Sequence, residues 1–242
     1  MTKKISFEHD RADSSALVSE LASVIAHDVR TPVRHIGQFL EFYQRELEAG
    51  NTAQAAEHLQ IVKESVALVS DMLDGVVTYA RLGRGLDEPC EVNLHKLAET
   101  AFSRACLALG RENVELILEG DPMAFGHDVR LQEMFVHLFE NAMVHSGDVE
   151  KLIIRVASYQ GEASTHIEVR DNGVGVPEGY DTIVFDLFQK GRKTKEVSSV
   201  GIGLSLARRI ARLHGGDLVL ERQTSSSGAE RPGLFVITLP KQ

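Results

Sequence analysis

The residues most able to do chemistry near the N-terminus are a histidine, an acid and a hydroxyl within five positions. His27, Asp28 and Thr31 lie in the stretch AHDVRTP, residues 26–32. An imidazole accepts a phosphoryl group when one ring nitrogen is unprotonated and a neighbour orients the ring. Asp28 can take the ring proton or fix the tautomer, and the Thr31 hydroxyl one helical turn later can reach the same chemistry. The stretch is a candidate phosphate acceptor.

A second group of residues, more than a hundred positions later, could hold a nucleotide. The side-chain amide oxygen of Asn141 can bind a hard cation such as Mg²⁺. The carboxylate of Asp171, at the end of an expected strand, can accept a hydrogen bond from an exocyclic amine. Gly173 and Gly175 follow it and let the backbone approach a planar base. Taken singly, these residues also fit a surface amide and a tight turn.

Further glycines open an expected helix, where free N–H groups and the helix dipole favour an anion. They are Gly201 and Gly203, followed by Leu204, and their order matches neither a P-loop nor a dinucleotide fingerprint. The segment before them, about 177–200, carries two aromatic residues and then a basic run. This order suggests a hinged lid over phosphates, although a solvated loop fits equally well. The residues concerned are Phe185, Phe188, Lys190, Arg192, Lys193 and Lys195.

Composition narrows the class of protein. The 242 residues carry a formal net charge of -9, which argues against nucleic-acid binding. The two cysteines, Cys90 and Cys106, lack metal-ligand spacing and indicate a reducing compartment. No apolar run is long enough to span a bilayer. We therefore expect a cytoplasmic protein or the cytoplasmic part of a membrane receptor. In either case we expect no membrane contact by these 242 residues.

The first part of the chain predicts two long helices, about 13–49 and 52–81, each with an apolar stripe at steps of three and four. Pro32 should interrupt the first helix just after His27. Two antiparallel helices cannot bury both stripes alone, so we expect a homodimer in which two hairpins form a four-helix bundle.

The rest of the chain predicts mixed helices and strands after a Gly/Pro-containing link. The expected helices are 94–109, 127–145 and 202–213, and the expected strands are 114–118, 152–159, 165–170, 218–221 and 234–239. The expected fold is thus a helical hairpin, residues 1–82, a linker, residues 83–89, and an α/β sandwich nucleotide-binding domain, residues 90–242.

With these motifs in order, the chain resembles the transmitter core of a bacterial two-component sensor histidine kinase from about residue 15 onward. His27 to Pro32 is similar to the phosphoacceptor box, and Asn141 falls on the Mg²⁺-ligating asparagine. Asp171 falls on the aspartate that reads the adenine amine. Gly173 and Gly175 match the family's first glycine box, and Phe185 and Phe188 match its aromatic box. Gly201 and Gly203 match its second glycine box.

The resemblance implies a mechanism with ATP and Mg²⁺ as cofactors. The γ-phosphoryl group would pass to His27, with Asp28 as proton acceptor or orienter, and then to an aspartate of a response-regulator receiver domain. It also implies a phosphatase activity that uses Asp28 and Thr31. The regulator would dock just below the histidine, where the candidate contact residues are Arg34, His35, Gln38 and the facing stretch 72–79.

Two positions depart from the family pattern and keep alternatives open. His137 stands where a second asparagine is usual, and Ser199 where a glycine is usual. An alternative function is therefore a weakly active homologue that regulates another histidine kinase by association, or serves as a phosphatase. A third class, an ATP hydrolase, would need a glutamate at the place that His137 occupies. The other histidines, among them His95, His127, His145 and His214, are expected to cap or pack.

Overall fold

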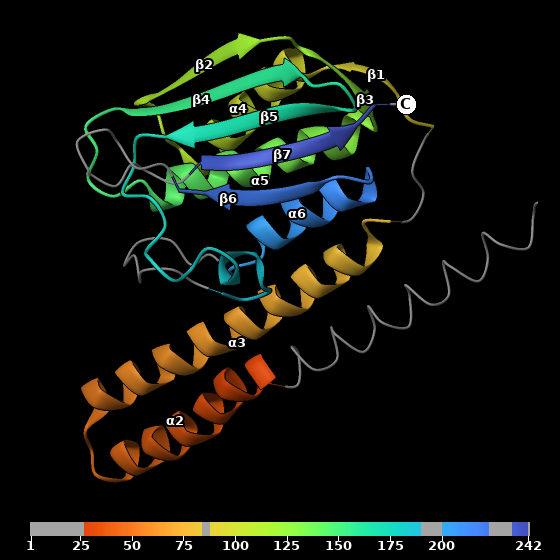
Figure 1. Cartoon of the computed structure of the whole chain (residues 1–242). Helices are drawn as coiled ribbons and strands as arrows, with labels where there is room; N and C mark the ends of the chain where they lie inside the picture. The colour runs from red at the N-terminus through yellow and green to blue at the C-terminus, as the bar shows by residue number, and fades with distance from the viewer. Residues whose placement is uncertain (1–26, 84–87, 190–199, 223–233, 242) are drawn as a thin grey trace, which may run out of the picture. The chain divides into compact units, whose positions relative to one another are not determined.

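The computed structural model describes residues 27–83, 88–189, 200–222 and 234–241 (Figure 1). The chain divides into two compact units between Arg81 and Leu82. Each unit is described by itself below. None of the described helices is long and apolar enough to cross a membrane.

The first unit is a helical hairpin of α2 (Arg30–Glu48) and α3 (Thr52–Arg81). Its turn uses Gly50 in the left-handed region, with φ at +78°, where glycine has no Cβ penalty. The Asn51 side-chain amide donates to Glu46 Oε2 at 2.7 Å and ties the turn to α2. The expected second helix and its turn are therefore confirmed in place.

The helical path is interrupted at Val29, between the helical residues His27 and Asp28 and the start of α2. Pro32 is buried and has no N–H with which to donate to the Asp28 carbonyl four residues back. The interruption predicted just after His27 is thus present, and the residues 13–26 of that expected helix lie outside the described part of the chain.

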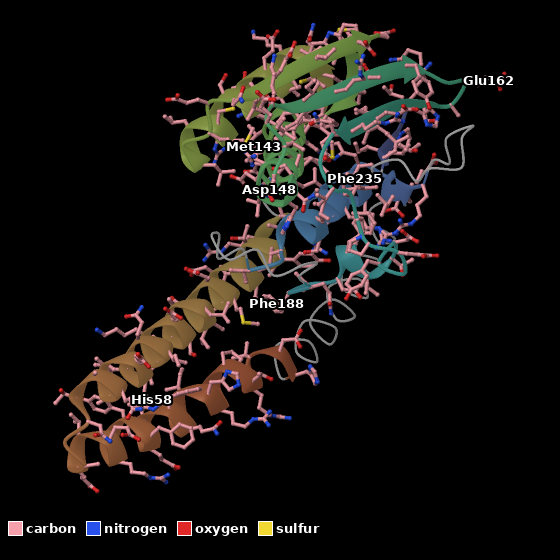
Figure 2. The ribbon with its side chains drawn as sticks, turned by 90° about the vertical axis from the view of Figure 1, so that its left-hand side faces the viewer. His58, Met143, Asp148, Glu162, Phe188 and Phe235 are labelled. Carbon is pink, nitrogen blue, oxygen red and sulfur yellow. The ribbon has the colours of Figure 1, made fainter. Side chains whose placement is uncertain are left out.

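The two hairpin helices each carry two apolar stripes rather than one. The first stripe is buried between α2 and α3 and includes Pro32, Ala55, Val62 and Met72. Beside it, Figure 2 shows His58 of α3 between the helices, where its ring packs within 6 Å of Phe39 and Phe42. The second stripe is 39–52% exposed and consists of Val33, Leu40, Leu47, Val66 and Leu73.

The second unit is built on a five-stranded sheet of order β2-β4-β5-β7-β6 and a small antiparallel pair, β1 with β3. Its strands are β1 (Cys90–Asn93), β2 (Val114–Gly120), β3 (Met123–Gly126), β4 (Leu152–Gln160), β5 (Ser164–Asp171), β6 (Asp217–Glu221) and β7 (Leu234–Pro240). In the large sheet only β2 and β4 are parallel neighbours.

Three helices cover one face of this sheet: α4 (Leu94–Leu109), α5 (Asp128–His145) and α6 (Gly203–Leu213) (Figure 1). Their apolar faces meet the alternate inward residues of the strands, as the helix and strand periodicities require. The resulting core contains Phe135 and Phe139 of α5, which stack on each other, and the fully buried Ile154, Ile167 and Ile237. This arrangement is the α/β sandwich that the sequence predicts.

Candidate functional site

His27 lies exposed at the start of the described hairpin, with 85% of its side chain accessible. Its Nδ1 lies 2.7 Å from Asp28 Oδ1. An ionised carboxylate only accepts, so Nδ1 carries the proton and Nε2 keeps its lone pair. The pair therefore presents an exposed imidazole whose orientation and tautomer are set by the adjacent acid. Thr31, in the first turn of α2, is also exposed.

In the second unit, Asp171 is the last residue of β5 and begins the glycine loop. Its Oδ1 accepts the backbone N–H of Gly173 at 2.8 Å. Burial raises the pKa of the Asp171 carboxyl, and backbone hydrogen bonds, that from Gly173 first, lower it in part. A half-buried carboxylate can accept more than one hydrogen bond at each oxygen, so it is suited to accept one from a ligand amine.

The glycine loop packs tightly against the C-terminal end of α5. Val174 N–H donates to the Ser146 carbonyl at 3.2 Å, and a Cβ on Gly173 would lie 2.8 Å from Ser146 Cα. A Cβ on Gly147 would lie 2.5 Å from Val174 Cγ1. Figure 2 labels Met143 and Asp148, which lie on either side of this end of α5. Gly173 is thus required by close approach of two backbones.

A stripe of half-buried polar side chains runs along α5 at intervals of four residues: His137, Asn141 and His145. None of the three makes a hydrogen bond to a described residue, and His137 only approaches Glu140, with Nδ1 3.8 Å from Oε2. Burial lowers the pKa of His145. Their polar atoms are not among the buried, unpaired ones of the described residues, so they can bond to solvent or to a ligand, and the stripe is a candidate ligand-binding surface.

The other end of this polar stripe faces the start of α6. Gly203 is the first residue of that helix, and a Cβ on it would lie 3.8 Å from the nearest atoms of His137. The N-cap residue, Ile202, provides no side-chain hydrogen bond to the first turn. Among the described residues, no side chain caps the leading N–H groups of α6, which lie beside His137 and could receive an anion.

Phe185 and Phe188 take different positions at the start of the expected lid. Phe185 is buried, edge-on to Phe235 of β7 and with the Arg208 guanidinium 4.9 Å above its ring. Phe188 has a φ of +65° and donates its N–H to the Gly201 carbonyl at 2.8 Å. This bond joins the described residues on either side of 190–199, and Lys190, Arg192, Lys193, Lys195 and Ser199 lie outside the described residues.

A nucleotide-bound Mg²⁺ ion needs only a few protein ligands, and these are oxygen atoms. The unpaired Asn141 amide fits, since Mg²⁺ takes one or two protein oxygens and completes its shell with phosphate and water. The described residues contain no cluster of three or more His, Cys, Asp or Glu side chains that could hold a metal by themselves. A metal here would therefore be held jointly with the nucleotide.

The structure thus brings Gly173 against Ser146 at the C-terminal end of α5 and Gly203 beside His137 in the middle of it. Gly175 follows in the same loop, with φ at +69°, and Leu204 packs its side chain into the core. His145, which the sequence analysis expects to cap or pack, is a further candidate on this stripe. Its spacing of four residues from Asn141 is the sequence signal for a shared helical face.

Sequence comparison with known proteins agrees with the family resemblance that the motifs indicate. Residues 126–242 match the histidine kinase-, DNA gyrase B- and HSP90-like ATPase family. The methanogenesis regulatory histidine kinase FilI of Methanothrix harundinacea is 29% identical over 93% of this chain. The sensor protein kinase PmrB of Pseudomonas aeruginosa is 30% identical over 91%. The chain spans 25% and 45% of the lengths of these two relatives.

Solved structures share the fold at lower identity. Histidine kinase ThkA, in complex with the response regulator TrrA, matches all of this chain with a TM-score of 0.65 at 19% identity, over 68% of that chain. The mycobacterial sensor histidine kinase MprB matches 63% of this chain, and 97% of its own, with a TM-score of 0.53 at 20% identity. Residues 126–242 thus belong to the histidine kinase-, DNA gyrase B- and HSP90-like ATPases, and the chain as a whole is similar in sequence to histidine kinases and shares their fold.

Proposed function

We propose that this chain is an ATP-dependent protein histidine kinase that phosphorylates His27 and then passes the phosphoryl group to an aspartate of a response-regulator receiver domain. The observation that carries the proposal is the 2.7 Å contact between His27 Nδ1 and Asp28 Oδ1 on an exposed ring. It prepares one specific nitrogen, Nε2, to act as a nucleophile.

The chemistry at His27 follows from that tautomer. The Nε2 lone pair attacks the γ-phosphorus, the bond from phosphorus to the bridging oxygen breaks, and ADP leaves with the bond electrons. Positive charge develops on the imidazole as the new N–P bond forms. The Asp28 carboxylate stabilises this charge and can take the Nδ1 proton, which leaves a neutral phosphorylated ring. Asp28 is therefore both an orienting and a proton-accepting group.

In the second unit, Asp171 accepts a hydrogen bond from the adenine amine, and the backbone at Gly173 and Gly175 lies under the base. The uncapped start of α6, at Gly203 and Leu204, faces the phosphates. Asn141 provides an oxygen for Mg²⁺, which when bound neutralises phosphate charge. From the lid, Phe188, Lys190 and Arg192 complete the nucleotide site.

The proposed partner is a receiver domain, which would dock on the hairpin next to His27. Arg34, His35 and Gln38 are exposed there on α2. ThkA, whose fold matches this chain throughout, was solved with a response regulator bound. The half-buried Asp28 and the exposed Thr31 would orient water onto the acyl phosphate of the regulator, which is the proposed phosphatase activity. Since ATP and the regulator are intracellular, we place the chain in the cytoplasm.

We also propose that two hairpins pair into a four-helix bundle. The exposed stripe of Val33, Leu40 and Leu47 on α2 lies at heptad spacing, as does that of Val66 and Leu73 on α3. Large apolar side chains in such a row are usually covered by a partner. A second copy of the same hairpin offers the same row and would bury both.

The alternative function is a homologue with little kinase activity that acts through another histidine kinase. His137 favours it, because an imidazole is a weaker ligand for Mg²⁺ than an oxygen. Such a chain would bind nucleotide, take up no label and form a complex with a second kinase.

The deciding experiment is incubation of the dimer with γ-labelled ATP and a divalent cation. The kinase predicts label that is acid-labile and base-stable, that is absent from His27→Gln, and that moves to a receiver domain. His27→Gln must still bind nucleotide with the parent affinity, which shows that the ATP site is intact. Nucleotide binding without any label in the parent would contradict the kinase and support the regulatory homologue. Phosphate release at the parent rate from His27→Gln would instead indicate a hydrolase.

A further inference from the structure

The imidazole of His137 makes no hydrogen bond within the described part of the chain and only a loose ion pair with Glu140. It is half-buried in the middle of α5, with 22% of its side chain exposed. Its Nδ1 lies 3.8 Å from Glu140 Oε2, beyond hydrogen-bond distance. Neither ring nitrogen is among the buried, unpaired side-chain atoms of the described residues, so the imidazole is open to solvent or to a ligand.

The surroundings of His137 place it at the nucleotide side of α5. It precedes Asn141 by four residues, so the two side chains lie on the same helical face, one turn apart. Gly203, at the start of α6, has no side chain to fill the space beside it, and a Cβ there would lie 3.8 Å from His137 Cβ. His137 thus borders the same space as the asparagine and the uncapped helix start.

An imidazole and an amide one turn apart form a mixed nitrogen and oxygen ligand pair. Mg²⁺ is a hard cation that takes oxygen ligands and gains little from nitrogen. Divalent ions of the first transition row, of which Mn²⁺ is the hardest, accept imidazole nitrogen more readily than Mg²⁺ does. Replacing an oxygen ligand by imidazole should therefore change which cation the site prefers.

We propose that His137 is the residue that sets metal specificity in this nucleotide site, and that the site prefers a transition-row cation such as Mn²⁺ over Mg²⁺. This proposal rests on the proposed nucleotide-binding function. His137 and Asn141 together supply the protein ligands, and the nucleotide phosphates and water supply the rest. If Asn141 were the single protein ligand of the metal, the site would have no such preference for a transition-row cation.

The test measures binding of a non-hydrolysable ATP analogue to the dimer with Mn²⁺, with Mg²⁺ and without metal. The ratio of the Mg²⁺ to the Mn²⁺ dissociation constant is compared between the parent and His137→Asn. Comparing proteins in this way cancels the preference of the free nucleotide for one ion. We expect the ratio to fall at least about tenfold in His137→Asn, a size typical of changes at metal sites. His137→Gln provides a second variant if the first does not fold.

Two controls separate His137 from other imidazoles. His166→Asn removes a ring on β5 that stacks on Tyr159 and contacts Ser164, away from α5, and should leave the ratio at the parent value. Electron spin echo spectra of the Mn²⁺–nucleotide complex should show nitrogen coupling from one imidazole. That coupling should disappear in His137→Asn and persist in His166→Asn.

The outcomes distinguish this inference from the proposed function. Nucleotide binding with the same metal ratio in the parent and in His137→Asn would overturn the metal role alone. An equal loss of affinity in that variant with and without metal would also overturn it, because the imidazole would then contact the nucleotide. Absence of nucleotide binding to the parent under every condition would instead overturn the proposed function.

Discussion

His214 connects the end of α6 to the start of α5 through both of its ring nitrogens. Nε2 accepts the backbone N–H of His127 at 3.0 Å, and Nδ1 lies 2.8 Å from the Ile210 carbonyl, to which it must donate. Both bonds exist only in the neutral tautomer with the proton on Nδ1. A Cβ on Gly126 would lie 2.7 Å from the His214 ring, so the chain before α5 is also fitted to this imidazole.

The fold should lose stability as the pH falls below neutral, partly because of His214. Burial lowers the pKa of His214, and His127 lowers it further, while the bond to Ile210 raises it in part. From about pH 6.5 downward the unfolded chain therefore binds a proton that the folded chain rejects, and the free energy of unfolding falls. One such group contributes at most about 1.4 kcal/mol per pH unit, and burial of His145 acts in the same direction.

Urea unfolding between pH 7.5 and 5.5 measures this effect. His214→Asn should be less stable than the parent at pH 7.5 and should lose less stability on acidification. Equal slopes for the two proteins would show that His214 does not titrate as its contacts require.

Replacing Asp171 by asparagine should separate stability from binding. The change removes a buried charge whose pKa is raised by burial, and keeps an oxygen that can accept the Gly173 N–H. We expect Asp171→Asn to unfold at the parent temperature or above it. Nucleotide affinity should fall by about 100-fold or more. The asparagine amide would point its N–H₂ group at the adenine amine, and two hydrogen-bond donors would then face each other. Calorimetric binding together with thermal unfolding gives both quantities, and undiminished binding would exclude Asp171 as the adenine contact.

The two glycines before and at the start of α6 should respond oppositely to alanine. Gly201 has φ at +78°, and a Cβ there would lie 2.4 Å from the Gln189 carbonyl oxygen, so Gly201→Ala should cost about 1–3 kcal/mol. Gly203 meets nothing closer than 3.8 Å, and Gly203→Ala should be neutral or stabilise by up to about 1 kcal/mol.

Chemical denaturation of the two variants provides the comparison. Gly203→Ala should nevertheless weaken nucleotide binding, because its methyl group enters the space beside His137. A destabilised Gly203→Ala protein, or a Gly201→Ala protein as stable as the parent, would contradict the backbone geometry at these positions.

The dimer prediction is tested on the exposed stripe of the hairpin. Leu40→Glu should raise the dimer dissociation constant at least about 100-fold, because each subunit would bring an unpaired carboxylate into the bundle. Leu107 on α4 is 86% exposed and provides the matched control, since Leu107→Glu makes the same change outside the stripe. Sedimentation equilibrium should show a shift toward monomer for Leu40→Glu alone. A monomeric parent would contradict the proposed bundle.

The sequence by itself determined the long elements, because their periodic patterns are local. Thr52–Arg81 and Leu94–Leu109 begin and end where the apolar repeat, the glycines and the caps predict. The order of the motifs around His27, Asn141 and Asp171 was equally readable. The short strands β1 and β3 were missed, since four residues carry little pattern and their pairing joins segments far apart in the chain.

Only the tertiary structure decided how the candidate residues are used, because their environments come from distant segments. Phe185 belongs with the lid by sequence, but Phe235 and Arg208 hold it in the core. Gly173 is required because Ser146 approaches it, and Gly203 leaves open the space beside His137. A spacing in the sequence shows which side chains share a face. The sequence cannot show whether the His137 imidazole is hydrogen-bonded, because that depends on the segments that pack against α5. In the structure it makes no hydrogen bond to a described residue and lies beside Gly203, so His137, which differs from the family pattern, becomes a candidate ligand.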